Sequence, residues 1–206
     1  HLALMKGCIQ IFAKAPIAGK VKTRMQPELD ANQSVELAKK LLHHSCHTAN
    51  EYGDAEVQLW CAPDTRHSYF QELAEKFSLT LFAQQGEHLG QRMINAMNHA
   101  LELGLRPMLI GADCPFIDDQ YLDAGFTSLD RHDVVLGPAT DGGYVLVGSK
   151  AVFANDCFEG IEWGTKDVLQ QTLQKLIDDG LSFELLGPLA DIDRYQDLEL
   201  LVDLFE

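Results

Sequence analysis

The 206-residue sequence lacks any C-x-x-C motif, although it contains five cysteines. The cysteines are odd in number and widely spaced, at Cys8, Cys46, Cys61, Cys114 and Cys157. This distribution is typical of reduced thiols in an intracellular protein, and it argues against a disulfide framework or a zinc site.

Long apolar runs are absent as well. No run approaches the ~20 residues that a membrane helix requires. The N-terminus has neither the apolar core nor the cleavage site of a signal peptide. His1 stands where Met is usual, so we expect residues 1–5 to derive from a tag or to be disordered. From these absences we expect a cytoplasmic protein.

Basic residues are scarce. The chain has 16 Lys and Arg against 31 Asp and Glu, which gives a formal net charge of −15. Such a negative field repels nucleic acid and anionic membrane surfaces, so neither is expected as the main partner. The hydrophobic content of 46% is sufficient for a sizeable core. No linker or repeat interrupts the chain, which predicts one domain over residues 1–206.

Secondary structure is predicted to alternate between strand and helix. Apolar, β-rich segments predict strands at 7–13, 56–62, 79–84, 106–115, 133–139, 143–148 and 183–189. Amphipathic segments predict helices at 31–50, with Asp30 and Gln33 as a capping pair, and at 68–77, 89–103, 166–178 and the C-terminus. This rhythm predicts an α/β fold with a mostly parallel central sheet flanked by helices. Ligands then bind beyond the carboxyl ends of the strands.

The segment "IFAKAPIAGKVKTR" (11–24) follows the first predicted strand and concentrates Lys14, Lys20, Lys22 and Arg24, with no acidic residue before Glu28. It does not have the spacing of a P-loop or of a dinucleotide fingerprint. Glycine allows close backbone approach, and Lys and Arg bind phosphate oxygens, so the loop is a candidate phosphate cradle. The alternative is a solvated basic loop.

Asp113 in "GADCP" follows the most apolar strand, where a carboxylate can help to hold Mg²⁺ or Mn²⁺ together with phosphate oxygens. The alternative role, an N-cap of the next helix, suits Asp118 or Asp119 better. Cys114 is more easily understood as a small buried residue than as a nucleophile.

Three later segments carry further candidates. In "GPATDGGYVLVG" (137–148), Asp141-Gly142-Gly143 suits a tight turn and also leaves Asp141 able to face a pocket. In "GIEWGTKDVL" (160–169), Trp163 and Gly164 suit a sugar or ring contact, whereas Thr165 can cap the next helix. In "ADIDRYQDLELL" (190–201), Asp191 and Asp193 alternate, so both can face a metal; Asp193 can instead cap the last helix.

Taken in order, "FAKAPIAGKVKTR", "GEHLGQRM", "GADCP", "GPATDGGYVLVG", "WGTKDVL" and "DIDRYQDL" resemble the DUF2064 family of bacterial proteins. Its members are uncharacterised and are assigned as nucleotide-diphospho-sugar transferases with a GT-A-type fold. Some are described as glycosyltransferases of arsenosugar biosynthesis. The resemblance covers about residues 7–204. The chain departs from the wider fold in having "ADC" in place of a full D-x-D, and Arg194 and Tyr195 where Thr and Pro are commoner.

The resemblance implies a role for each matching residue. It implies a metal site at Asp113 and Asp193, and it places Asp113 and Asp141 at the catalytic centre. The residues implied to bind the nucleotide or its phosphates are Ala13, Lys14, Pro16, Gly19, Lys20, Lys22, Thr23, Arg24, Gly86, Leu89, Gly90 and Arg92. Those expected to line the substrate pocket are Gly142, Gly143, Tyr144, Trp163, Gly164 and Thr165.

Three functions remain open at this point. The first is Mg²⁺- or Mn²⁺-dependent transfer of a glycosyl group from a nucleotide-diphospho-sugar to a small acceptor, with Asp141 positioning or deprotonating the acceptor hydroxyl. The second is nucleotidyl transfer, in which a phosphorylated substrate attacks an NTP and pyrophosphate leaves. The third is a nucleotide-binding regulator with a degenerate site. The oligomeric state is open, with a homodimer as one option.

Overall fold

A sheet of seven strands runs through residues 5–202, the part of the chain that the computed structural model describes. Residues 1–4 and 203–206 lie outside it, so the expectation for residues 1–5 falls almost entirely outside the described residues. The strands are β1 (Gly7–Lys14), β2 (Ala55–Ala62), β3 (Thr80–Ala83), β4 (Arg106–Gly111), β5 (Val134–Pro138), β6 (Tyr144–Ser149) and β7 (Phe183–Leu185).

The spatial order of the strands is β3-β2-β1-β4-β6-β5-β7. Within this sheet β6 is antiparallel to both of its neighbours, β4 and β5, and the other pairings are parallel. The predicted mostly parallel α/β sheet is therefore confirmed. The antiparallel pairing of β5 with β6 also places a reversal of the chain between them, where the sequence predicts a tight turn.

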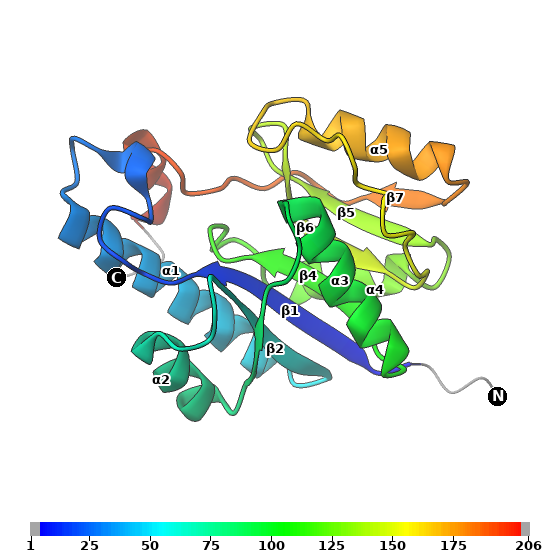
Figure 1. Cartoon of the computed structure of the whole chain (residues 1–206), viewed down its shortest axis with the longest axis horizontal. Helices are drawn as coiled ribbons and strands as arrows, with labels where there is room; N and C mark the ends of the chain where they lie inside the picture. Colours follow the sequence, from blue (N-terminus) through cyan, green and yellow to red (C-terminus); the bar gives the residue numbers. More distant parts are fainter. Residues whose placement is uncertain (1–4, 203–206) are drawn as a thin grey trace.

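Helices cover both faces of the sheet, which makes a three-layer sandwich. The helices are α1 (Ala31–Tyr52), α2 (Ser68–Phe77), α3 (Leu89–Glu102), α4 (Asp119–Ser128) and α5 (Val168–Asp178), with 3₁₀ turns η1 (Thr23–Met25) and η2 (Tyr195–Leu201). Side chains of α1, α2 and α4 form one core cluster with the sheet, and those of α3 and α5 form another. In Figure 1, α3 lies in front of the sheet and α4 behind it.

The alternation of side chains in β1 explains how one strand serves both cores. Ile9, Ile11 and Ala13 belong to the cluster under α1 and α2, whereas Phe12 belongs to the cluster under α3 and α5. Because each face of a central strand is buried, the strand reads as a nearly continuous apolar run, interrupted by the buried Gln10, which donates to Gln58 and to the Ala96 carbonyl. Burial of an aliphatic side chain of this size stabilises the fold by about 1.5–3 kcal/mol.

Local capping signals account for two helix starts. The Asp30 carboxylate accepts a hydrogen bond from the Gln33 backbone N–H at 2.8 Å, and the Gln33 side chain accepts one from the Asp30 N–H at 2.9 Å, a capping box. Asp118 accepts from the Tyr121 N–H at 2.8 Å and caps α4, as predicted. Asp113 is therefore not needed as a cap.

Two alternative cap assignments are wrong. Helix α5 begins at Val168 after Asp167, and Thr165 instead donates a hydrogen bond to the Glu162 carbonyl at 2.8 Å. The residue before η2 is Arg194, not Asp193. At this end the Asp197 carboxylate accepts hydrogen bonds from the backbone N–H groups of Asp193 and Arg194, which leaves the Asp193 side chain available for other contacts. Of the helices within residues 5–202, none is long and apolar enough to cross a membrane.

Candidate active site

The strand order reverses between β1 and β4, and this is where open α/β sheets bind ligands. From β1 the chain continues to β2 and β3 on one side, whereas β4 lies on the other. The parallel register pairs Lys14 with Ala62 and Phe12 with Gly111, so these strands end at the same edge. The loops 15–30 and 112–118 therefore leave the sheet side by side.

The C-terminal segment crosses the same edge and brings distant residues to these loops. After β7, Leu189 forms a parallel bridge with Ala139, and the backbone N–H of Ile192 donates to the Asp113 carbonyl at 2.9 Å. In Figure 1 this segment (orange to red) passes across the sheet edge, and η2 lies beside the blue loop that follows β1. The "ADID" motif is thereby placed next to "GADCP".

The basic loop after β1 has a defined conformation. Gly19 and Lys22 have φ angles of 76° and 52°, in the left-handed region where glycine is at ease and lysine is uncommon. Val21 and Met25 are buried, and Met25 packs with Leu41 and Ile192 in a small core cluster. These apolar residues anchor the loop against α1 and the C-terminal segment.

Lys22, whose side chain is buried, forms an ion pair with the exposed Asp113. Its Nζ donates to Asp113 Oδ1 at 2.6 Å and to the Ile192 carbonyl at 2.6 Å. The Lys22 side chain is 5% exposed, whereas that of Asp113 is 56% exposed. A single ammonium thus joins the loop after β1, the loop after β4 and the C-terminal segment.

Arg24 forms a second, more open ion pair with Asp193. Arg24 Nη1 donates to Asp193 Oδ2 at 2.7 Å, and the two side chains are 53% and 34% exposed. The hydrogen bond and the charge of Asp193 raise the pKa of the Arg24 guanidinium further above its usual value. Lys22 and Arg24, which have no acidic neighbour in the sequence, are therefore paired with aspartates from the second half of the chain.

A cavity of about 580 Å³ lies between the basic loop and the ends of β1 and β4. Its predicted lining residues are Ala13, Lys14, Pro16, Lys20, Lys22, Thr23, Arg24, Leu89, Asp113 and Asp193. Residues not singled out from sequence complete it: Phe12, Val21, Ala38, Leu42, Gln84, Gly111 and Ala112. We call it the basic cavity, because four cationic side chains line it against two carboxylates.

A second cavity of about 490 Å³ adjoins the first and shares Arg24, Leu89 and Asp193 with it. Predicted residues in its lining are Asp141, Gly143, Tyr144, Trp163, Gly164 and Thr165; the remainder are Met93, Thr140, Lys166, Val168, Ala190, Asp191, Arg194, Asp197 and Leu200. We call it the acidic cavity. The Arg24–Asp193 ion pair lies at the boundary between the two.

One wall of the acidic cavity is aromatic. The rings of Tyr144 and Trp163 meet edge to face with centroids 6.4 Å apart. The indole Nε1 of Trp163 is buried and finds no hydrogen-bond partner among the described residues. Burial raises the pKa of Tyr144, so this phenol stays neutral at physiological pH. An apolar aromatic wall suits the apolar face of a ring-shaped ligand such as a sugar.

Carboxylates also line this cavity. Asp141 lies in the β5–β6 turn, where its Oδ1 accepts the Gly143 N–H at 3.0 Å. The neighbouring Asp191 is largely buried, and burial together with the charges of Asp113, Asp141 and Asp193 raises its pKa to about 7, against the opposing effect of Lys22. The lining thus sets four aspartates, Asp141, Asp191, Asp193 and Asp197, against three cations, Arg24, Lys166 and Arg194.

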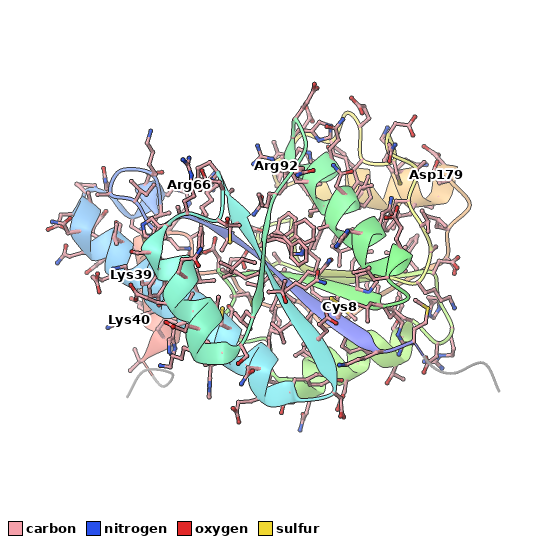
Figure 2. The ribbon with its side chains drawn as sticks, turned by 60° about the horizontal axis from the view of Figure 1, so that its bottom comes forward. Cys8, Lys39, Lys40, Arg66, Arg92 and Asp179 are labelled. Carbon is pink, nitrogen blue, oxygen red and sulfur yellow. The ribbon has the colours of Figure 1, made fainter. Side chains whose placement is uncertain are left out.

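Five predicted residues line neither cavity: Gly19, Gly86, Gly90, Arg92 and Gly142. Arg92 Nε donates to the Gly86 carbonyl at 3.1 Å and so braces the loop that leads into α3, and Figure 2 shows Arg92 at the start of that helix. A Cβ on Gly90 would contact Phe158 and Trp163, so this glycine allows close packing behind the aromatic wall. Binding roles for these five residues stay predictions.

Several lining residues were missed from sequence. Gln84 directly follows β3 and donates to the Trp60 carbonyl at 2.9 Å, so the rule that ligands bind beyond strand ends could have indicated it. Asp191, which the sequence pairs with Asp193 as able to face a metal, lines the acidic cavity. Leu89, which the resemblance implies near the nucleotide, is 42% exposed and lines both cavities. No short-range signal marks Thr140, Lys166 or Arg194 as pocket residues.

The donor set bears on whether a divalent cation fits. The available ligands are carboxylate oxygens, which suit Mg²⁺ or Mn²⁺. Within residues 5–202, however, no group of three or more His, Cys, Asp or Glu side chains is arranged to hold a metal. Asp113 and Asp193 are also engaged by Lys22 and Arg24. The residues fit a cation only when ligand oxygens from elsewhere, such as phosphates, complete its shell.

Comparison with known proteins shows which sequences and folds this chain resembles. Residues 42–165 match the family model of the uncharacterized protein conserved in bacteria (DUF2064). A crystal structure from Desulfovibrio desulfuricans G20, provisionally assigned as a nucleotide-diphospho-sugar transferase, is similar at 31% identity and a TM-score of 0.86, covering 97% of this chain and 87% of that one. No curated protein matches this chain.

More distant structures share the fold. A nucleotidyl transferase from Methanothermobacter thermautotroptrophicus matches with a TM-score of 0.60 at 14% identity, covering 96% of each chain. A cytidylyltransferase from Leptospira borgpetersenii serovar Hardjo-bovis (strain JB197) matches with a TM-score of 0.58 at 15% identity, covering 96% of this chain and 85% of that one. At these identities the likeness establishes a common fold.

Proposed function

The chain belongs to the DUF2064 family of bacterial proteins, and on that premise we propose that it transfers a glycosyl group from a nucleotide-diphospho-sugar to a small acceptor. The observation that carries the proposal is the pair of adjoining cavities at the carboxyl edge of the sheet, one basic and one aromatic and acidic. A donor with a diphosphate at one end and a sugar at the other needs two such compartments side by side.

The basic cavity is the proposed nucleotide site. Lys14 and Lys20 are exposed at its rim, and Arg24 stands at the boundary where a diphosphate joined to a sugar would pass. Glycosyl transfer leaves negative charge on the departing diphosphate, and fixed cations stabilise that developing charge. The base and ribose are proposed to lie toward Leu89 and the loop 86–92.

A divalent cation is proposed to complete the charge balance. Asp113 and Asp193 are the residues that would hold it, with phosphate oxygens supplying further ligands. Bound Mg²⁺ or Mn²⁺ supplies Lewis-acid neutralisation of the diphosphate. The residues of this chain would meanwhile orient the donor and keep the leaving group in place.

The acidic cavity is the proposed site of the sugar and the acceptor. The Tyr144–Trp163 wall offers an apolar surface on which a sugar ring can stack. Asp141 is exposed and held by its bond to the Gly143 N–H, so it can accept a proton from, or a hydrogen bond of, an acceptor hydroxyl.

Nucleotidyl transfer is the second candidate, because a nucleotidyl transferase and a cytidylyltransferase share the fold. In that reaction the basic cavity would bind a triphosphate and the product would be pyrophosphate. The second cavity sets Arg24, Lys166 and Arg194 against four aspartates, so its charge does not decide between the two reactions. We place glycosyl transfer first because the Tyr144–Trp163 wall suits a sugar ring and because the relative at 31% identity is assigned as a nucleotide-diphospho-sugar transferase.

A product analysis separates the two candidates. The protein is incubated with Mn²⁺ and UDP-, GDP-, CDP- or ADP-glucose in one series, and with the four NTPs plus glucose 1-phosphate in another. Glycosyl transfer, or the slow hydrolysis that accompanies it, releases a nucleoside diphosphate in the first series. Pyrophosphate release in the second series, with no nucleoside diphosphate in the first, would contradict our assignment. Asp141→Asn is expected to lower the first signal by about 10²-fold or more.

A further inference from the structure

The groups that the proposed ligands require are bound to each other in the free protein. A diphosphate needs cations, and Arg24 is held by Asp193; a divalent cation needs carboxylates, and Asp193 is held by Arg24. A diphosphate and a divalent cation would each compete for a charge that this 2.7 Å hydrogen bond already uses. The Arg24–Asp193 pair is therefore a point at which nucleotide and cation binding are linked.

This pair is well placed to open, and the neighbouring pair is not. Arg24 is 53% exposed, makes one hydrogen bond in the described structure and lines both cavities. Lys22 is 5% exposed and its ammonium is held by two acceptors, one of them the Ile192 carbonyl in the adjoining segment. An exposed ion pair contributes little net stability, whereas a buried group with two partners is costly to release.

We propose that Arg24 and Asp193 exchange partners on ligand binding, so that the diphosphate takes the guanidinium while the divalent cation takes the carboxylate. The proposal rests on the proposed function and adds a rule for how its two ligands bind. Binding of the nucleotide alone leaves Asp193 without a counter-charge next to an anion. Binding of the cation alone leaves Arg24 without a counter-charge and next to a second positive charge. Each ligand removes the obstacle to the other.

The consequence is positive coupling between the two ligands. Coupling between sites is reciprocal: the factor by which the cation tightens nucleotide binding equals the factor by which the nucleotide tightens cation binding. We expect a factor of about 5–150, the usual range for coupled ligands. Direct contact between cation and phosphate contributes to any such factor, so variants are needed to isolate the exchange.

The exchange predicts gains of affinity from the loss of a single charged group. Asp193→Asn frees Arg24, so nucleotide binding without metal becomes tighter by about two- to fivefold, the factor expected when a partly exposed ion pair no longer competes. Arg24→Gln frees Asp193, so Mn²⁺ binding without nucleotide becomes tighter by a similar factor. In the Arg24→Gln/Asp193→Asn variant, the factor by which the cation tightens nucleotide binding should fall. What remains is the part due to direct contact between the cation and the phosphates.

Matched controls separate exchange from a general change in charge. Asp141→Asn removes a carboxylate that also acts on Arg24 through space but forms no ion pair with it in the described structure. Lys20→Met removes a cation from the basic cavity whose ammonium forms no ion pair within residues 5–202. Both controls change the field of the site by one charge and leave the Arg24–Asp193 pair in place.

The experiment measures binding of the full chain without relying on turnover. Free Mn²⁺ is followed by electron paramagnetic resonance, and UDP, GDP, CDP and ADP are titrated calorimetrically with and without Mn²⁺. If the partners exchange, Asp193→Asn tightens nucleotide binding without metal more than Asp141→Asn does. Likewise, Arg24→Gln tightens Mn²⁺ binding without nucleotide more than Lys20→Met does. Equal effects within each pair overturn the exchange while the proposed function stands. Absence of nucleotide binding by the wild-type protein, with or without Mn²⁺, overturns both.

Discussion

Two ion pairs that start only two residues apart, Lys22–Asp113 and Arg24–Asp193, behave differently in this fold. Their lengths are nearly equal, 2.6 Å and 2.7 Å. The lysine, however, is buried and has a second acceptor, whereas the arginine is half exposed and has one. Equal geometry therefore does not mean equal function: the first pair joins three segments of the site, and the second divides two cavities and can be opened.

The difference originates in the buried apolar residues Val21 and Met25, which flank the two cations. Met25 is fully buried with Leu41 and Ile192, and it fixes the end of the loop against α1 and the C-terminal segment. This anchor directs Lys22 inward, where its left-handed backbone conformation is maintained by the surrounding contacts. Arg24, on the outer side of η1, is directed toward the cavities. Four predictions test this contrast, in order of decreasing effect.

The largest effect is expected from loss of the anchor. Met25→Ala removes a fully buried side chain and leaves a cavity under η1, so the free energy of unfolding should fall by about 2–5 kcal/mol. Urea unfolding followed by circular dichroism measures it. Leu89→Ala, at a 42% exposed position, serves as the control and should stay within about 0.5 kcal/mol of the wild type. A Met25→Ala cost as small as that of the control would contradict the anchor.

The next effect concerns Asp191, which lies close to both pairs and whose pKa is raised to about 7. The folded protein then holds this proton more tightly than the unfolded chain, so the stability it contributes falls as pH rises from about 4 to about 7. In metal-free buffer, Asp191→Asn should match the wild type near pH 4 and exceed it by about 2–4 kcal/mol at pH 8. Urea unfolding at several pH values measures this difference, and a difference that does not change with pH would contradict the shifted pKa.

Of the two ion pairs, Lys22–Asp113 is expected to show the larger coupling energy, because its ammonium is buried. A double-mutant cycle of Lys22→Met and Asp113→Asn should give a coupling of about 1–3 kcal/mol in the free energy of unfolding, the range for hydrogen bonds to charged groups. Strict additivity of the two changes would show that the ammonium does not join these segments. Lys22→Arg is a useful companion variant, because it keeps the charge but changes the shape of the group.

The smallest effect is expected from the open pair. The corresponding cycle of Arg24→Gln and Asp193→Asn should give only about 0.2–1 kcal/mol, because both side chains are partly hydrated and the attraction is screened by salt. The cycle of Arg66→Gln and Asp64→Asn, an exposed pair at 2.6 Å after β2 that lines neither cavity, sets the scale (Figure 2 shows Arg66). A value for Arg24–Asp193 that equals the Lys22–Asp113 coupling would remove the contrast between the two pairs.

The same contrast shows what could be predicted from sequence. Features set by neighbouring residues were within reach: the Asp30–Gln33 capping box, the cap at Asp118 and the chain reversal at Asp141-Gly142-Gly143. The mostly parallel sheet was also predicted, because buried parallel strands have a distinct apolar pattern. These signals act over a few residues, so one sequence is enough to detect them.

Long-range partners were not within reach. Lys22 meets Asp113 across 91 residues and Arg24 meets Asp193 across 169, and no local pattern indicates which acid will neutralise which base. The motifs therefore identified the segments of the site but not their pairing. That residues 1–206 form one domain stays a prediction.

The most direct test of the central claim is a calorimetric titration of UDP-, GDP-, CDP- and ADP-glucose in the presence of Mn²⁺. The wild-type protein is compared with the Lys14→Met/Lys20→Met variant, which removes two cations from the rim of the basic cavity. We predict that at least one of these nucleotide sugars binds the wild type and that the variant binds it about tenfold or more weakly, since each lost charge-assisted hydrogen bond costs about 1.5–3 kcal/mol. Equal affinity in both proteins, or no binding by the wild type, would contradict a nucleotide site in the basic cavity.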